Sequence, residues 1–365
     1  MRHRPELDGL RAVAVLAVVA SHTGATITLG GWTGVDVFFV LSGYLITALL
    51  LEEHDRFGRV DLGRFYARRA LRLYPALVVL LLLGAGFHRT LGDGATVAGY
   101  LRSAAAAGLY VQDFVLGFTH TSPGGFGHTW SLAVEEQFYL VWPVAFVLLV
   151  RWRRDPLGWV LVGIVAGWVS LTLSLRTSPE AVPYASYFLP WNRFPQLLVG
   201  CASAILLARH GAPRWVGRAS FGATAVVAGV ATTACAAFLP RYPHLPWQAP
   251  AIALSTAALL WHLSADSPSV WRRVLSIRPA VWLGRRSYGV YLFHAPVLLV
   301  LETHLPWRRS VTAVVMVVVT LVLAALSYRV VELPFLRRKP RVRPREAQPP
   351  VGAALTPAAP AARGI

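Results

Sequence analysis

Charged residues are scarce in this chain. They make up 14% of its 365 residues, against about 25% in an average soluble domain, whereas 55% of the residues are apolar. Cysteine is scarcer still, because only Cys201 and Cys235 occur, both within apolar segments. Neither a disulfide framework nor a zinc-site spacing is therefore indicated, and we interpret both as small packing residues. The lack of charge argues against a water-soluble fold.

Acidic residues are scarcer than basic ones. Lys and Arg number 35 against 17 Asp and Glu, which gives a formal net charge of +18. The arginines gather in short linkers between apolar segments instead of following one face or helix, so we predict no nucleic-acid partner. Such linkers are typical of the cytoplasmic side of a membrane protein.

Apolar stretches of about 20 residues recur along the whole chain, and each can cross a hydrocarbon core of roughly 30 Å at about 1.5 Å per helical residue. The clearest lie at 9–28, 33–51, 74–91, 129–150, 157–176, 193–209, 219–239, 248–264, 288–303 and 310–331. We therefore predict an all-α polytopic transmembrane helix bundle of ten spans. The basic N-terminus imitates a secretory signal, but Asp8, Arg11 and the later spans favour an uncleaved first helix.

The stretch 96–117 is apolar but contains Arg102, Gln112 and Asp113. If it crossed the membrane, the basic loop at Arg151 and all later ones would lie outside, against the positive-inside rule. We predict instead an interfacial or re-entrant element, with both termini cytoplasmic.

The domain boundary follows from composition. A membrane domain is expected over 1–335, and the Pro-, Ala- and Arg-rich segment 336–365 is expected to be a disordered cytoplasmic tail. This composition fits a high-GC bacterium, so we place the chain in the bacterial cytoplasmic membrane.

Ionisable side chains within apolar spans cost several kcal/mol to insert and so mark functional sites. His22 follows Arg11 by eleven residues, about 16 Å along a helix, which would put Arg11 near the cytoplasmic end and His22 near the midplane. A buried imidazole stays neutral and suits a general base that accepts a hydroxyl proton. A lone histidine is more often structural, but the remaining polar residues favour a functional one.

The segment HTWSLAVEEQFYLVWP, at 128–143, carries the adjacent acids Glu135 and Glu136 within an apolar span. Adjacent helical residues diverge by about 100°, so at most one of them readily joins His22. A purely structural carboxylate is the alternative. We favour Glu136 over Glu135 as the partner of the histidine.

The linker RFYARRALRLYP, at 64–75, offers a compact cationic surface. Arg68 and Arg72 are four residues apart, and Arg69 and Arg72 three, so a helix brings them together. Guanidinium groups match phosphate oxygens. Anchoring at the inner surface with bound anionic lipid is an equally open interpretation.

Further polar residues lie in GGWTGVDVFFVLSGYLIT, FLPWNRFPQ and SYGVYLFHAPV. Asp36 is expected to cap its helix or to orient the site, and His294 to be structural or to line a substrate. The residues that we expect to line the site are Asp36, Ser42, Ser131, Arg193, Tyr288 and His294.

Five stretches and a final VELP occur in a familiar order: RPELDGLRAVAVLAVVASH, GGWTGVDVFFVLSGYLIT, RFYARRALRLYP, HTWSLAVEEQFYLVWP and RRSYGVYLFHAPV. Over about residues 4–335 the chain resembles the membrane acyltransferase type 3 family. That family includes bacterial O-acetyltransferases of lipopolysaccharide and peptidoglycan, and macrolide O-acyltransferases.

The resemblance implies acyl-CoA, commonly acetyl-CoA, as co-substrate, with no tightly bound cofactor and no metal. It implies a hydroxyl acceptor such as a glycan, a lipid-linked sugar or a macrolide-like molecule. It also implies three functional pairs: Arg11 with His22, Arg69 with Arg72, and Glu135 with Glu136. Many relatives carry a C-terminal extracytoplasmic hydrolase-like domain that is missing here, so transfer is expected to finish in the membrane domain or to pass to a separate extracytoplasmic acyltransferase.

We expect the arginines of 68–72 and Arg11 to bind the CoA phosphates, and the pantetheine arm, roughly 15–20 Å long, to carry the thioester up to His22. His22 would deprotonate the acceptor and Glu136 would stabilise the imidazolium. A covalent acyl-histidine step is allowed but not required.

Two rival interpretations stay open on the sequence. A transporter or flippase would also need His, Glu and Arg within its spans. In a non-catalytic scaffold the same residues would only bond helices together.

Overall fold

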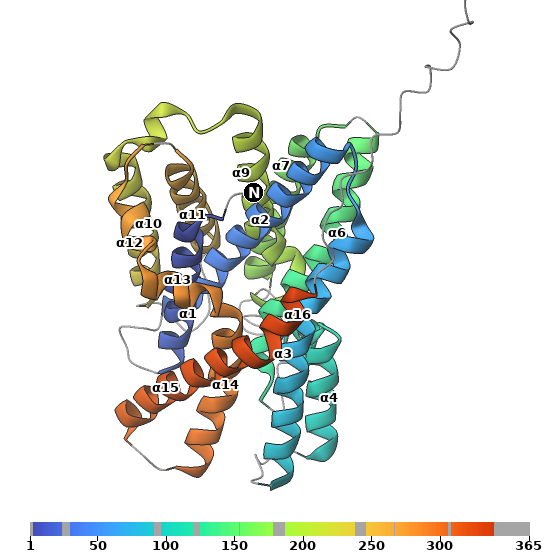
Figure 1. The fold of residues 1–365 in the computed structure, drawn as a ribbon, viewed down its shortest axis with the longest axis vertical. Coiled ribbons are helices and arrows are strands. Elements are labelled where there is room, and N and C mark those ends of the chain that lie inside the picture. The colour runs from blue at the N-terminus through green and yellow to red at the C-terminus, as the bar shows by residue number, and fades with distance from the viewer. Residues whose placement is uncertain are drawn as a thin grey trace, which may run out of the picture.

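The computed structural model describes residues 3–23, 30–90, 96–119, 125–152, 154–177, 187–237, 246–265, 267–305 and 308–338. Within these ranges the regular structure is helical, without a strand (Figure 1). The predicted all-α class is therefore confirmed. The proposed tail falls outside the described residues from position 339 onward.

Ten long helices occupy the ten predicted stretches in the described part of the chain. They are α1 (Pro5–His22), α2 (Thr33–Phe57), α3 (Leu62–Thr90), α6 (Trp130–Arg151), α7 (Pro156–Thr177), α9 (Pro190–His210), α10 (Ala219–Ala237), α11 (Gln248–Ser264), α14 (Ser287–His304) and α15 (Arg309–Ser327). Shorter helices are α4 (Val97–Gly108), α5 (Gln112–Thr119), α12 (Val270–Leu275), α13 (Arg278–Arg285) and α16 (Leu333–Arg337). The segment Tyr328–Glu332 is π-helical.

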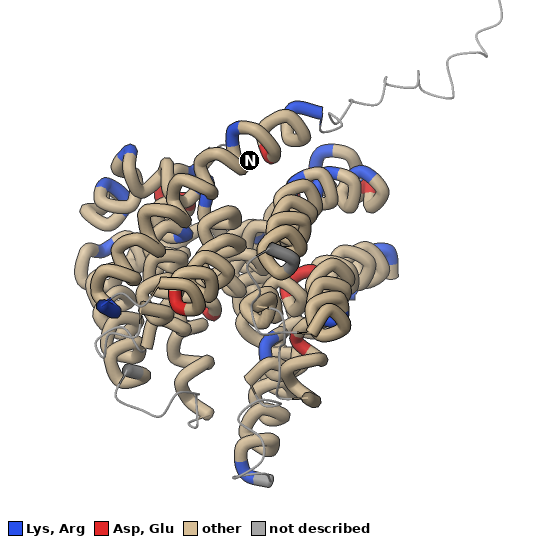
Figure 2. Tube along the Cα trace, turned by 90° about the horizontal axis from the view of Figure 1, so that it is seen from below, with Lys and Arg blue, Asp and Glu red and all other residues tan. Residues whose placement is uncertain are grey.

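Among the described residues, six helices are long and apolar enough to cross a membrane: Gly30–Phe57, Leu62–His88, Gly127–Arg151, Pro156–Arg176, Ala219–Ala236 and Arg309–Arg337. This fits the predicted membrane bundle. Figure 2 shows Lys and Arg spread more widely over the trace than Asp and Glu.

The doubtful stretch 96–117 forms the two short helices α4 and α5. They contain 12 and 8 residues, which gives lengths of about 18 and 12 Å, so neither can cross a core of roughly 30 Å alone. The turn between them carries Tyr110 at φ 54°, a left-handed conformation. The stretch is a helical hairpin.

Glycines allow the closest packing of the bundle, where α2 lies along α9. A Cβ atom on Gly43 would lie 1.8 Å from the backbone oxygen of Leu197, and one on Gly200 would lie 2.1 Å from that of Val40. Small residues therefore let the two backbones touch. The thiol of buried Cys201 lies 3.5 Å from the Gly43 oxygen in the same contact. Cys235 is exposed on α10, so its assignment as a packing residue is wrong.

In Figure 1, α2 runs obliquely between two groups of helices. The first group contains α1 and α10–α13, and the second contains α3, α4 and α6. This arrangement brings α1, α2, α3, α6 and the start of α14 around one polar cavity.

Candidate functional site

A cavity of ≈ 80 Å³ lies among α1, α2, α3, α6, α14 and the tip of the α4–α5 hairpin. Eight of the residues predicted from the sequence line it: Arg11, Ser42, Arg69, Arg72, Ser131, Glu135, Glu136 and Tyr288. The predicted residues that do not line it are His22, Asp36, Arg68, Arg193 and His294. The cavity therefore gathers both predicted acids and three predicted arginines.

Arg69 is held by acids and by an aromatic ring. Its Nε and Nη2 atoms donate hydrogen bonds of 3.1 and 3.0 Å to Oε1 of Glu136, and Nη2 lies 3.8 Å from Oε1 of Glu135. The guanidinium carbon lies 3.0 Å from the centre of the Tyr139 ring. The charge of Arg69 is thus compensated from α6.

Glu135 accepts short hydrogen bonds from the hydroxyls of Ser42 and Tyr139. Both carboxylates therefore have partners other than His22. The expected pairing of Glu136 with His22 is corrected here: the facing arginine of α3 takes the carboxylate, because opposite charges in a poorly solvated cavity attract strongly.

Arg11 and Arg72 line the same cavity from α1 and α3. Neither forms an ion pair within the described residues, and Nε of Arg11 is buried without a hydrogen-bond partner. Arg68 instead pairs with Glu53 at 3.2 Å, outside the cavity. Guanidinium groups that face a cavity without an ion pair can bind an anion, and their shape matches phosphate oxygens.

His22 is the last residue of α1. Its Nδ1 lies 2.9 Å from the backbone oxygen of Val18, so Nδ1 donates and the lone pair is left on Nε2. The residue is exposed because the helix ends here, so the imidazole is buried only on the side that faces His294. The His22 ring stands edge-on to His294, with the ring centres 4.8 Å apart.

His294 in turn lies 5.5 Å from His128 between ring centres. Nδ1 of fully buried His294 lies 2.5 Å from the Tyr291 oxygen, and its Nε2 has no hydrogen-bond partner among the described residues. Nε2 of His128 lies 3.0 Å from the Leu292 oxygen. We call His22, His128 and His294 the histidine cluster; in the described residues no group of three such side chains is arranged to hold a metal ion.

Tyr291 connects the cavity to the histidine cluster. Its ring lines the cavity and lies 5.3 Å from the ring of His294. Its hydroxyl donates to the backbone oxygen of His128 at 2.7 Å and contacts the hydroxyl of Ser131 at 2.5 Å. A single side chain therefore separates the arginine-lined cavity from the three imidazoles.

Asp36 and Arg193 form a buried ion pair beside the cavity. Their atoms Oδ1 and Nη1 are 3.2 Å apart, and each side chain is 2% exposed. Arg193 also donates from Nε to the Tyr187 oxygen at 2.5 Å. Asp36 makes no helix cap, because its carboxylate bonds across to α9, so the expected capping role is wrong.

Sequence reasoning missed several residues of the site. His128 and Tyr139 stand in the same motif as the two acids, and Tyr291 in the motif of His294, but tyrosines carry no strong signal in an apolar span. Glu332 lies buried in the π-helical segment, and its Oε1 atom has no hydrogen-bond partner among the described residues. Its carboxylate is attracted by the charge of Arg72. Single π turns often occur at functional sites. The sequence VELP, which contains Glu332, was the signal that could have pointed to this residue.

Comparison with known proteins assigns the chain. A family model for the acyltransferase domain matches residues 4–329. The chain belongs to this acyltransferase family. The predicted resemblance is thereby confirmed, and the family assignment favours an enzyme over a transporter or a scaffold.

Relatives of this acyltransferase are named for O-acetyl transfer. The chain is 32% identical over 362 residues to peptidoglycan O-acetyltransferase OatA of Listeria monocytogenes, covering 91% of the chain and 56% of the relative. It is 33% identical to putative peptidoglycan O-acetyltransferase YrhL of Bacillus subtilis, with 91% and 55% covered. It is 32% identical to putative O-acetyltransferase SAS0844 of Staphylococcus aureus, with 92% and 58% covered.

The chain thus spans just over half the length of these curated relatives. No solved structure matches the acyltransferase.

Proposed function

We propose that this acyltransferase moves an acyl group, as acetyl, from acyl-CoA to a hydroxyl of a glycan or a related acceptor. The observation that carries the proposal is the cavity lined by Arg11 and Arg72, which form no ion pair in the described residues, together with the histidine cluster. The names of the relatives favour an acetyl donor and a peptidoglycan-like acceptor. A lipid-linked sugar or a macrolide-like acceptor offers the same hydroxyl chemistry.

The donor end of the site is the cavity. Arg11 and Arg72 would bind the CoA phosphates, because both face the cavity and neither forms an ion pair within the described residues. Arg69 would shape the cavity through its bonds to Glu136. Arg68 pairs with Glu53, so we do not include it among the phosphate-binding arginines that the sequence suggested.

The acceptor end is His22. Nε2 of His22 would take the proton of the acceptor hydroxyl while the hydroxyl oxygen attacks the carbonyl carbon of the thioester. The carbon–sulfur bond then breaks, and the imidazolium returns the proton to the CoA thiolate. The Val18 oxygen, in place of Glu136, would hold the imidazole by its Nδ1 hydrogen. Exposure of His22 leaves room for an acceptor that arrives from outside the bundle.

The topology we propose has ten crossings, with both termini cytoplasmic, in the bacterial cytoplasmic membrane. Six of the ten long helices in the described residues are long and apolar enough to cross a membrane alone, and the α4–α5 hairpin is too short to add a crossing; the other four long helices would cross within the bundle. Asp155, which precedes α7, and Arg209, near the end of α9, meet at 2.5 Å, so those two helix ends share a side. A separate extracytoplasmic acyltransferase would complete transfer if the acceptor lies beyond the membrane.

The proposal is tested by replacing His22 with Ala in the full chain, purified in detergent, and measuring acetyl-CoA consumption and transfer by mass spectrometry. General-base catalysis contributes about 10²–10⁴ in rate, so the variant should lose at least a hundredfold. His210→Ala is the matched control, because His210 also ends a helix and is exposed. Near-normal turnover by folded H22A would sink the proposal.

A further inference from the structure

A second cavity lies on the other face of α1, away from the arginines. It measures ≈ 510 Å³ and is bounded by α1, α2, α10, α11 and α12. Apolar side chains, glycine and a few hydroxyls line it, with no charged residue. Such a surface cannot carry the polar transfer chemistry, so the proposed function leaves it unexplained. We call it the apolar groove.

The apolar groove has the depth of one membrane leaflet. On α10 its lining runs from Ala225 to Ala234, nine residues or about 14 Å, which is half of a hydrocarbon core of roughly 30 Å. At one end the hydroxyls of Thr33 and Thr233 meet at 3.0 Å. Val230 on its edge is 63% exposed, so the groove opens onto the outer surface of the bundle.

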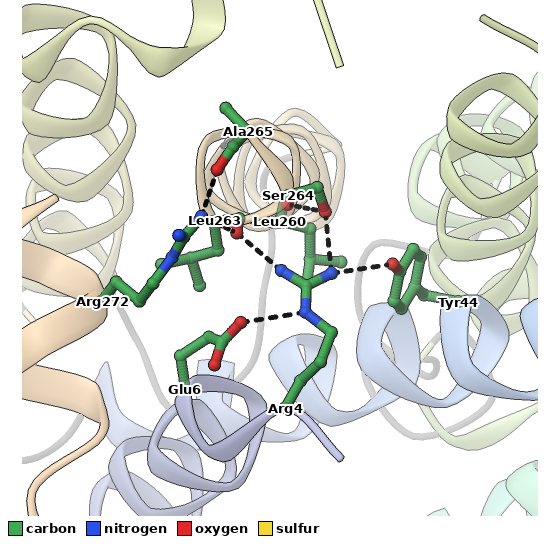
Figure 3. Close-up of polar contacts among 8 residues, drawn as sticks. All are labelled: Arg4, Glu6, Tyr44, Leu260, Leu263, Ser264, Ala265 and Arg272. Carbon is green, nitrogen blue, oxygen red and sulfur yellow. Dashed lines mark hydrogen bonds and ion pairs between the residues drawn. The ribbon is translucent and has the colours of Figure 1, made fainter. Parts of the chain in front are cut away.

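The other end of the groove is the basic one. Trp271, Val274 and Leu275 of α12 line it. Arg272 holds α12 in place, because its Nη2 donates to the backbone oxygens of Leu263, at 2.8 Å, and of Ala265 at the end of α11 (Figure 3). This bonding satisfies carbonyls that a helix end leaves free.

Two further arginines flank this end of the groove, and neither donates to backbone carbonyls as Arg272 does. Arg273 follows Arg272 on α12, and Arg218 directly precedes α10. Both are exposed and form no ion pair or side-chain hydrogen bond within the described residues. From 181 to 301 the sequence contains one acid, Asp266. This end of the groove therefore carries two exposed arginines without an ion pair in the described residues, whereas the nearby acids of α1, Glu6 and Asp8, pair with Arg4 and Arg285.

Exposed apolar residues sit beside these cations. Val270, Ile277 and Trp282 of the α12–α13 region are 60%, 52% and 42% exposed. Tryptophan and apolar side chains mixed with arginine are typical of a helix that lies at the membrane interface. The rim would therefore stand at the level of lipid headgroups.

We propose that the apolar groove binds an anionic phospholipid, with one acyl chain along α10 and the phosphate between Arg218 and Arg273. The depth of the groove matches an acyl chain, and its lateral opening lets that chain enter from the bilayer. The two arginines match the phosphate of the headgroup. A second copy packed through the same face would cover the groove as well, but 181–301 would offer these arginines a single acid, Asp266.

Two variants fill the groove from opposite helices. A Cβ atom on Gly229 would meet the Ser255 hydroxyl at 3.4 Å, an ordinary contact, so Gly229→Leu places its side chain in the groove. Ser255→Leu fills it from α11. The matched control is Ala228→Leu, on an exposed position of the same helix.

The measurement is native mass spectrometry of the detergent-purified full chain with phosphatidylglycerol or phosphatidylcholine. We expect at least tenfold better retention of phosphatidylglycerol by the wild type and by A228L, and a tenfold loss in G229L and S255L. Retention by both filled variants equal to wild type, or loss of a dimer mass in place of a lipid mass, overturns the proposal.

The headgroup is tested separately. The double variant Arg218→Gln, Arg273→Gln should bind the two lipids equally, whereas Arg151→Gln, an exposed arginine at the end of α6, should keep the preference. An unchanged preference in the double variant also overturns the proposal. These readouts do not depend on acyl transfer, so they stand apart from the test of His22.

Discussion

Three arginines near the start of α3 meet three different environments. Arg68 bonds Glu53, Arg69 bonds Glu136, and Arg72 faces the cavity without an ion pair in the described structure. The residues are at most four positions apart, yet the angle of about 100° per residue turns each toward a different neighbour. We therefore propose donor binding for Arg72 and not for the whole motif.

The first prediction separates these arginines. Arg72→Gln should raise the KM for acetyl-CoA tenfold or more, because a charged hydrogen bond to phosphate contributes about 1.5–3 kcal/mol. Arg68→Gln should leave KM within about twofold, because Arg68 lies outside the cavity. The loss of its partly exposed ion pair with Glu53 changes stability by only about 0–1 kcal/mol. Steady-state kinetics of the two purified variants decide the matter, and equal KM values would contradict it.

A second prediction compares two Asp–Arg pairs. Asp36→Ala leaves Arg193 buried and uncompensated, which should cost about 3–5 kcal/mol. Asp155→Ala breaks an exposed pair with Arg209, worth about 0.2–1 kcal/mol. Thermal unfolding in detergent should therefore show a large loss of stability for D36A and little change for D155A.

The exposed pair also has a pH dependence of known sign. Hydrogen bonds from Arg209 lower the pKa of the Asp155 carboxyl. Its small contribution is therefore complete above the ordinary pKa of aspartate and is lost as the pH falls through the lowered value. Above that range, D155A and wild type should keep a constant difference; a difference that grows toward acid would contradict this assignment.

At the scale of elements, the α4–α5 hairpin places one tyrosine in the cavity. Tyr110 at its tip is 7% exposed, whereas Leu109 before it is 73% exposed. The left-handed backbone of Tyr110 costs free energy for a residue other than glycine and persists where the surroundings enforce it. Gln137 of α6 supplies that restraint, since its Nε2 donates to the Tyr110 oxygen at 2.9 Å and to Asp113 at 3.0 and 3.1 Å.

The third prediction concerns this restraint. Gln137→Leu removes the donor and leaves buried acceptors unsatisfied, at a cost of about 1–3 kcal/mol. Hydrogen exchange should then accelerate over 97–119 and remain unchanged in α10, which packs against α11. Mass spectrometry of peptic peptides reports both regions in one experiment. Equal acceleration in both would mean that the whole bundle, and not the hairpin, depends on Gln137.

At the scale of the whole molecule, long apolar runs predicted the helices because burial in lipid demands internally bonded backbone. The partners of His22 were not predictable, because spacing along α1 and α6 does not determine how the two helices rotate toward each other. The Asp36–Arg193 pair joins residues 157 positions apart. Tyr110 was missed because a strained turn has no apolar periodicity.

The last prediction tests the number of crossings. If the α4–α5 hairpin enters and leaves on one side, reporter domains inserted between α3 and α4 and between α5 and α6 must share a compartment. Alkaline phosphatase should be active, and green fluorescent protein dark, at both positions; an insertion after Gly58, between α2 and α3, should give the reverse. Opposite results at the two hairpin flanks would mean that 96–117 crosses. Every later basic loop would then lie outside, against the positive-inside rule, whereas Arg11 and Arg72, which precede this stretch, would keep their side.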